Sequence, residues 1–227
     1  MGNALALYLV LVLGVVPFAA WRAASQGLIL NMPRSLLYRS ALRTSWFLAL
    51  LGTAALWWDQ RLTPQEIGLT ARAPRALLIA GVTTLALLLA GLLAFFAVRR
   101  LLGGTESPQL LHLIPRSRDE RLLFSALALS AGITEELVFH GIAITALTRI
   151  SILSGPHRPW VAALLVSLPF GLGHGYQQLA GVIRAGLLGF GLAVPFLLTG
   201  SLLPGMFAHA LIDLTLLTAP WRRLARP

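Results

Sequence analysis

Apolar residues occur along the chain in long runs, separated by short polar segments rich in arginine, proline and glycine. A helix needs about 20 mostly apolar residues to cross the hydrocarbon core of a bilayer. By this measure the sequence predicts seven spans, at residues 3–21, 36–58, 75–98, 121–148, 159–176, 179–198 and 201–219. Because backbone polar groups in lipid must be satisfied within each helix, the predicted fold is all-α. We expect a polytopic transmembrane helix bundle of about seven spans, within a range of six to eight.

The second segment fits a span least well, because Arg39 and Arg43 fall in its first two turns. Part of it could lie along the membrane interface, which would leave six spans. The longest polar connection is residues 99–121. It divides the chain into an N-terminal transmembrane region at 1–120, with about three spans and the connecting loop, and a second region at 121–219. A basic tail at 220–227 follows.

Composition agrees with a membrane protein. The chain is 57% hydrophobic and 11% charged, with a mean hydropathy of +0.79, whereas soluble domains carry about 25% charged residues. All 18 basic residues are arginine and the net charge is +10, yet they sit between apolar runs rather than in a patch with interleaved aromatic residues. Nucleic acid is therefore excluded as a partner. The absence of cysteine excludes disulfides, thiolate ligands and a cysteine nucleophile.

The distribution of arginine predicts the topology. With seven spans, twelve arginines fall on one side of the membrane and five on the other, and Arg184 lies inside the sixth span. Cytoplasmic loops carry the excess, so the N-terminus is predicted outside and the C-terminus in the cytoplasm. Arginine without lysine is typical of a GC-rich bacterial genome, so we expect a multi-pass protein of a bacterial inner membrane.

Ionisable residues inside membrane spans are costly and are therefore candidates for function. Besides Arg184, the second region contains Glu135, Glu136, His140, His174, His209 and Asp213. Three pairs are spaced four residues apart, so each lies on one face of its helix: Glu136 and His140, Phe170 and His174, and His209 and Asp213. Glycine and alanine residues next to these pairs permit close helix contact. The sequence thus predicts a polar cavity within the membrane.

Structural roles compete with this interpretation for single residues. His174 or His209 alone could be an interhelical hydrogen-bond partner, and Phe170 is more typical of packing. Two adjacent carboxylates in mid-span are harder to explain as structure, because they must be neutralised, paired or hydrated. Arg184 could extend its side chain to the interface or pair with an acidic residue of the cavity.

Carboxylates and histidines permit two kinds of hydrolytic chemistry. The chain has no GxSxG elbow, no HExxH helix and no GxxxxGK[ST] loop. Glutamate and histidine can deprotonate a water molecule and stabilise an oxyanion without a cofactor. The alternative is a zinc ion held by Glu135, His174 and His209. We favour the version without a metal, because no HExxH helix is present.

Three motifs carry a family resemblance. EELVFH at 135–140, FGLGH at 170–174 and HALID at 209–213 resemble the EExxxR, FxxxH and HxxxN or HxxxD motifs of the CPBP family, also called ABI. These are intramembrane endopeptidases related to the CAAX prenyl protease Rce1. The run TGSLLPGMFAHALID from Thr199 is similar to the family's approach to its third motif. The resemblance covers about residues 121–217, so it identifies 121–219 as a protease core.

The resemblance implies a function for each motif. Glu135 would be the general base for the catalytic water, with His174 assisting. His209 and Asp213 would complete the water or oxyanion site, and Glu136, His140 and Phe170 would support the cavity. The implied substrate is a membrane-associated protein or peptide. The alternative is a non-catalytic membrane protein that keeps the fold, such as an immunity or scaffold factor, or a proton-carrying transporter.

The first motif departs from the family at one position. His140 stands where the family has arginine. On the sequence alone, His140 would replace the arginine as a partner of a buried acid only when protonated. Arg184 is a second candidate for the missing charge.

Overall fold

The computed structural model describes residues 2–59, 62–70, 73–101, 103–150, 153 and 155–218. These residues form helices and connecting turns, with no strand among them. The prediction of an all-α fold is therefore confirmed. The predicted basic tail at 220–227 lies outside the described residues.

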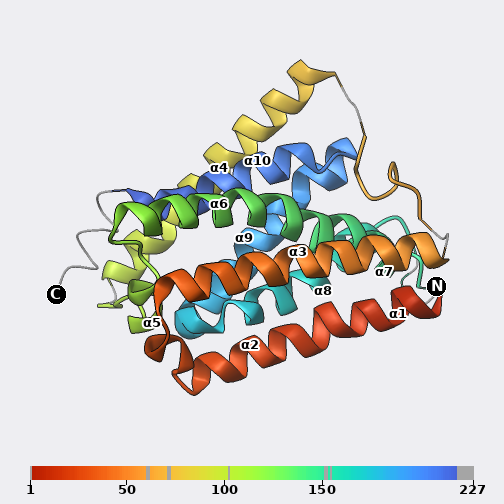
Figure 1. Cartoon of the computed structure of the whole chain (residues 1–227). Helices are drawn as coiled ribbons and strands as arrows, with labels where there is room; N and C mark the ends of the chain where they lie inside the picture. The colour runs from red at the N-terminus through yellow and green to blue at the C-terminus, as the bar shows by residue number, and fades with distance from the viewer. Residues whose placement is uncertain are drawn as a thin grey trace.

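Three long helical segments precede the connecting loop (Figure 1). The first is continuous: α1 (Asn3–Val10) leads through the π-helix η1 (Leu11–Val15) into α2 (Val16–Ser25). A 3₁₀ turn, η2 (Leu28–Asn31), joins it to α3 (Arg34–Asp59), and α4 (Pro74–Leu101) follows. The connecting loop contains one short helix, α5 (Pro108–His112).

Four long segments make up the second half of the described chain. The first comprises α6 (Arg118–Glu135), the π-helix η3 (Glu136–Ile144) and the short α7 (Thr145–Leu147). The others are α8 (Arg158–Gly173), α9 (Gln178–Thr199) and α10 (Leu203–Leu214). Two 3₁₀ turns complete the set, η4 (Gly175–Gln177) before α9 and η5 (Thr215–Leu217) after α10.

The seven helical segments follow the seven predicted ones, with shifted ends. Four are long and apolar enough to cross a membrane: Asn3–Ser25, Pro74–Leu101, Arg118–Leu147 and Gly175–Thr199. The segments at Arg158–Gly173 and Leu203–Leu217 are apolar but shorter. α3 is not among the four, and three arginines lie in its first ten residues. It nevertheless runs along α1 and α6 as part of the bundle (Figure 1).

The start of α6 is fixed by its cap. The Ser117 hydroxyl accepts a hydrogen bond from the Glu120 backbone N–H, and the Glu120 carboxylate accepts one from the Ser117 N–H. This capping box satisfies two backbone donors at the helix end. It explains why α6 begins at Arg118 instead of at 121, where the apolar run begins.

Glycines bring the helices of the second half into close contact. A Cβ on Gly132 would lie 2.8 Å from the Met206 carbonyl oxygen of α10, and one on Gly171 would lie 2.7 Å from the Val182 carbonyl oxygen of α9. Neither position can therefore accommodate a side chain without a shift of backbone. The predicted role of small residues beside the polar pairs is confirmed at both positions.

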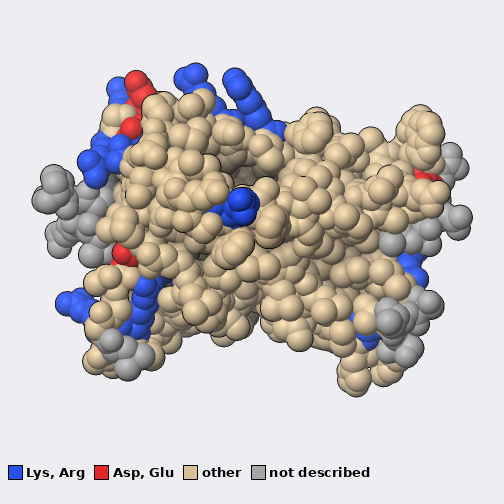
Figure 2. Space-filling model, turned by 90° about the horizontal axis from the view of Figure 1, so that it is seen from below, with Lys and Arg blue, Asp and Glu red and all other residues tan. Residues whose placement is uncertain are grey.

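Charged side chains gather toward the ends of the bundle. Figure 2 shows a broad area of uncharged residues, with many of the blue and red side chains toward the left of this face and one blue side chain near its middle. Large apolar side chains are exposed on the outer surface, including Leu87, Leu93 and Leu187. An apolar belt between charged ends is the pattern of a membrane protein.

Candidate active site

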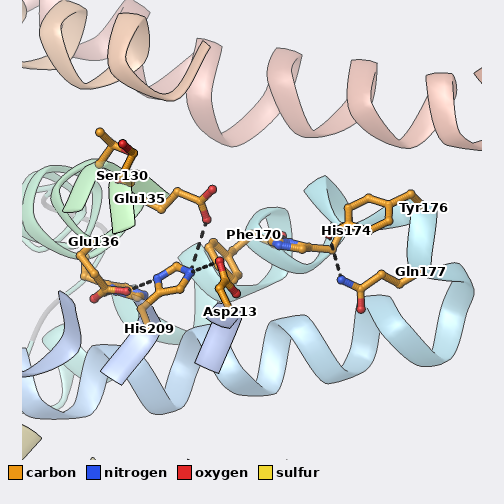
Figure 3. A network of polar contacts seen from close by, with 11 residues as sticks. Ser130, Glu135, Glu136, Phe170, His174, Tyr176, Gln177, His209 and Asp213 are labelled. Carbon is orange, nitrogen blue, oxygen red and sulfur yellow. Dashed lines mark hydrogen bonds and ion pairs between the residues drawn. The ribbon is translucent and has the colours of Figure 1, made fainter. Parts of the chain in front are cut away.

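Glu136 is the centre of a buried polar cluster formed where α6 passes into η3 (Figure 3). Its side chain is fully buried, and it accepts two hydrogen bonds from histidine. His140 Nδ1 lies 2.6 Å from Oε2, and His209 Nδ1 lies 2.8 Å from Oε1. The predicted pairing of Glu136 with His140 one turn away is thus present. Glu136 also joins η3 to α10 through His209.

His209 faces carboxylates with both ring nitrogens. While Nδ1 donates to Glu136, Nε2 lies 3.8 Å from Glu135 Oε2 and 3.9 Å from Asp213 Oδ2. The hydrogen bond at one nitrogen of a histidine determines which role is left to the other. Nε2 is therefore the atom of His209 that is available to a water molecule or a substrate.

Glu135 and Glu136 point in different directions although they are neighbours in sequence (Figure 3). The Glu136 side chain is inaccessible to solvent, whereas 29% of the Glu135 side chain is accessible. A Cβ on Gly205 would lie 2.6 Å from Glu136 Oε2, so α10 closes directly over this carboxylate. Glu135 instead lines a cavity. One carboxylate is thus built into the framework and the other is free to react.

The cavity has a volume of about 440 Å³ and lies among α2, α3, α4, α6, α8, α9 and α10. Its polar lining includes Glu135, His174, His209 and Asp213, and most of the remaining wall is leucine, alanine and phenylalanine. The structure therefore brings the four predicted catalytic residues to one cavity. An apolar cavity with a few convergent polar groups is the usual form of a binding site.

Phe170 is the common packing surface for the histidines. Its ring centroid lies 4.9 Å from that of His174, 6.1 Å from that of His209 and 6.3 Å from that of His140. The ring is 5% exposed. Its contacts support the predicted role in packing.

His174 lies at the end of α8 and is oriented by its own helix. Its Nδ1 lies 2.9 Å from the Phe170 carbonyl oxygen, so Nδ1–H donates there and Nε2 stays available. No hydrogen bond or ion pair among the described residues joins His174 to Glu135 or His209. His174 therefore shares the cavity with them but stands apart from the cluster around Glu136.

The zinc alternative finds no ligand set here. Among the described residues, no three His, Asp or Glu side chains form a group that could hold a metal ion. The trio considered for zinc, Glu135, His174 and His209, is not gathered around one point in this structure.

His140 contacts Glu136 through Nδ1. A neutral imidazole can donate from Nδ1, so the 2.6 Å contact with Glu136 does not require a protonated ring. His140 Nε2 is buried and has no hydrogen-bond partner among the described residues. A second N–H at this atom would be unsatisfied, which costs free energy in a buried site. His140 can therefore hold Glu136 through Nδ1–H alone.

Arg184 does not supply a charge to this cluster. It is 7% exposed, and its contacts are with Glu106 of the connecting loop, at 3.6 Å, and with the side-chain oxygen of Gln177. Of the two alternatives for Arg184, the structure shows a pairing with an acid, but the acid is Glu106 of the connecting loop and not an acidic residue that lines the cavity. Sequence reasoning missed Glu106, Tyr176 and Gln177, because nothing in their spacing indicates a contact with the polar residues of the spans.

The bundle and its site together define a membrane protein with a buried glutamate–histidine cluster beside an apolar cavity. Residues 118–215 match the family model described as Type II CAAX prenyl endopeptidase Rce1-like. These residues therefore form an Rce1-like domain, and the three motifs at 135–140, 170–174 and 209–213 lie within it. No curated protein and no solved structure matches the chain.

Proposed function

We propose that this protein is an intramembrane endopeptidase that hydrolyses a peptide bond of a membrane-associated protein or peptide. One observation carries the proposal: the Glu135 carboxylate faces the cavity and lies 3.8 Å from Nε2 of His209. Two polar atoms at this separation can both lie within about 2.8 Å of one water oxygen, which is the distance that general base catalysis requires. The Rce1-like domain supports a protease.

The reaction then uses the side chains in a fixed order. Glu135 takes a proton from the water, and the water oxygen forms a bond to the carbonyl carbon of the substrate. A histidine N–H stabilises the resulting oxyanion; the candidates are Nε2 of His174 and Nε2 of His209, each when its ring carries two protons. Glu135 then returns its proton to the amide nitrogen, and the C–N bond breaks.

Asp213 and Glu136 act on His209 from opposite sides. Glu136 holds Nδ1 at 2.8 Å and so fixes the plane of the ring. Asp213, 3.9 Å from Nε2, faces the cavity and is placed to hold the water or the histidine proton. We further propose that the arginine-rich end, where α2 ends and α6 begins, faces the cytoplasm of a bacterium.

The test compares the products of the wild-type protein with those of Glu135→Gln in the same host membrane. New peptide N-termini, identified by mass spectrometry, should appear with the wild type and fall by about a hundredfold in the variant, because the amide cannot accept the proton. Glu66→Gln is the matched control. Glu66 lies in the turn after α3 and pairs with Arg149 at the surface, so its replacement should leave cleavage unchanged.

Two results would refute the proposal. Full cleavage of a verified substrate by Glu135→Gln would remove Glu135 as the base. An identical set of N-termini in both membranes would favour the non-catalytic scaffold, which keeps the fold without hydrolysis.

A further inference from the structure

Arg184 is a buried cation that the reaction above does not use. It belongs to α9, is 7% exposed, and lines the same cavity as Glu135 and His174. Its guanidinium carbon lies 4.8 Å from the centre of the Phe96 ring and 5.8 Å from that of Phe95. Burying a charge is costly unless it is paired and hydrogen-bonded. The buried position of Arg184 therefore requires a physical explanation.

The acid beside Arg184 is shared with a second arginine. Arg99 Nη1 lies 3.0 Å from Glu106 Oε1, whereas Arg184 Nη1 lies 3.6 Å from Oε2, beyond hydrogen-bond distance. Both Arg184 Nη1 and Glu106 Oε2 are buried without a hydrogen-bond partner among the described residues. Two guanidinium groups thus face one carboxylate. The cluster carries one positive charge in excess, and one donor of Arg184 is unsatisfied.

The position of Arg184 adds to this excess. Its Nη2 donates to the Gln177 side-chain oxygen, so the guanidinium group lies by the residue that precedes α9. The N-terminal end of a helix carries a partial positive charge. A cation is unfavourable there unless an anion is also present.

A row of polar groups leads from Arg184 to the proposed catalytic residues. Gln177 Nε2 donates to the Tyr176 hydroxyl at 3.1 Å, and the Tyr176 ring lies 5.9 Å from that of His174 (Figure 3). Gln178, which follows, has φ +60° and ψ −176°, a conformation almost confined to glycine. The strained residue ends the turn that presents Tyr176 and Gln177 to the cavity.

We propose that Arg184 and Gln177 form an anion-binding subsite of the cavity that takes a carboxylate of the peptide substrate, with Glu106 as the resident counter-ion that the substrate displaces. This proposal rests on the proposed endopeptidase function. A carboxylate accepts two parallel hydrogen bonds from a guanidinium group, so it would satisfy the donor that Glu106 leaves without a partner. A peptide fixed at this point would lie along the polar row toward His174.

The test measures binding in the Glu135→Gln background, where the substrate is not consumed. The probes are acetyl-trileucine with a free carboxylate and the same peptide with a C-terminal amide, chosen because the cavity wall is rich in leucine. In neutral detergent, the acid should bind about tenfold or more tightly than the amide, as expected for one charge-assisted pair of hydrogen bonds. Arg184→Gln should abolish the preference.

Glu106→Gln gives an effect of the opposite sign. It removes the competing carboxylate, so the acid should bind several-fold more tightly while the amide is unaffected. A merely structural ion pair predicts no gain. If Arg184→Gln does not fold, Glu106→Gln still tests whether the subsite binds a carboxylate. Arg34→Gln is the matched control, because Arg34 pairs with Glu120 outside the cavity lining and its loss should leave the preference unchanged.

Three results would overturn the proposal: equal binding of acid and amide, an acid preference that survives Arg184→Gln, or a weaker preference in Glu106→Gln. A fourth is Arg184-dependent binding of dihexanoylphosphatidylglycerol without an acid preference, which would assign the subsite to a lipid phosphate. The binding test does not require hydrolysis, so the two proposals can fail separately. If only the endopeptidase proposal fails, cleavage is absent and the acid still binds more tightly than the amide. If only the subsite proposal fails, cleavage is present and the acid preference is absent.

Discussion

Nδ1 of His209 on α10 lies 2.8 Å from Oε1 of Glu136, a residue that precedes it by 73 positions. This contact fixes the third motif against the first and leaves Nε2 of His209 facing Glu135. In the proposed function, Glu136 is a positioning residue, which acts through His209 and not on the substrate.

Glu136→Gln should weaken both stability and activity. The amide oxygen can accept only one of the two Nδ1–H bonds, so one histidine must turn its proton to the other nitrogen. For His140 that nitrogen is buried without a partner. We expect a loss of about 1–3 kcal/mol in the free energy of unfolding and slower cleavage, measured by denaturation and by peptide release. Wild-type values for both would contradict the role given to Glu136.

Two substitutions of His140 should separate the contribution of its hydrogen-bond donor to stability from the contribution of its side-chain volume. Asparagine keeps an N–H that can reach Glu136, whereas leucine leaves Oε2 without its 2.6 Å contact. We expect His140→Leu to unfold more readily than His140→Asn by about 1–3 kcal/mol. Equal midpoints of thermal unfolding would mean that the ring serves only to fill space.

Gly205→Ala should damage the site from the side of α10. The new methyl group would lie 2.6 Å from Glu136 Oε2 and 3.2 Å from the Leu192 carbonyl oxygen, so α10 would have to move away from η3 and α9. We expect a lower unfolding temperature and reduced cleavage. The matched control is Gly91→Ala in α4, where the methyl group would meet nothing within 4 Å and should be neutral or slightly stabilising. Similar behaviour of the two variants would show that the contact is not tight.

Chelation should distinguish the two hydrolytic mechanisms. Without a metal, cleavage by the purified protein should be unchanged after prolonged incubation with 1,10-phenanthroline. A zinc site predicts slow loss of activity and its recovery when zinc is added. Such recovery would establish the zinc version in place of the one proposed above.

The sequence predicted much of the site because the physics of the bilayer restricts what it can contain. Helix number follows from apolar length, and Glu136 and His140 meet because residues four apart share a helix face. The contacts between helices were harder to predict from the sequence. That His209 binds Glu136 more closely than Glu135 depends on the rotation of α10, and no spacing within one helix encodes it.

Arg184 shows a second limit of prediction from the sequence. It stood out as a charge inside a span, but its partner Glu106 belongs to a loop that hydropathy treats only as a connection. Nothing in the residues around Glu106 marks it as buried. Its side chain is 11% exposed and is held between Arg99 of α4 and Arg184 of α9, which is a property of the assembled bundle.

The π-helix η3 has a consequence for comparing this protein with its relatives. Because its turns contain more residues than those of an α-helix, the chain from Glu136 to Ile144 takes up extra sequence without advancing as far along the helix axis. A relative that keeps an ordinary α-helix here would need fewer residues to reach the same end of the bundle. Sequence alignments should therefore be allowed a gap between the EELVFH motif, which aligns without one, and α7; otherwise the residues of α7 would be matched to neighbours that face another side of the helix.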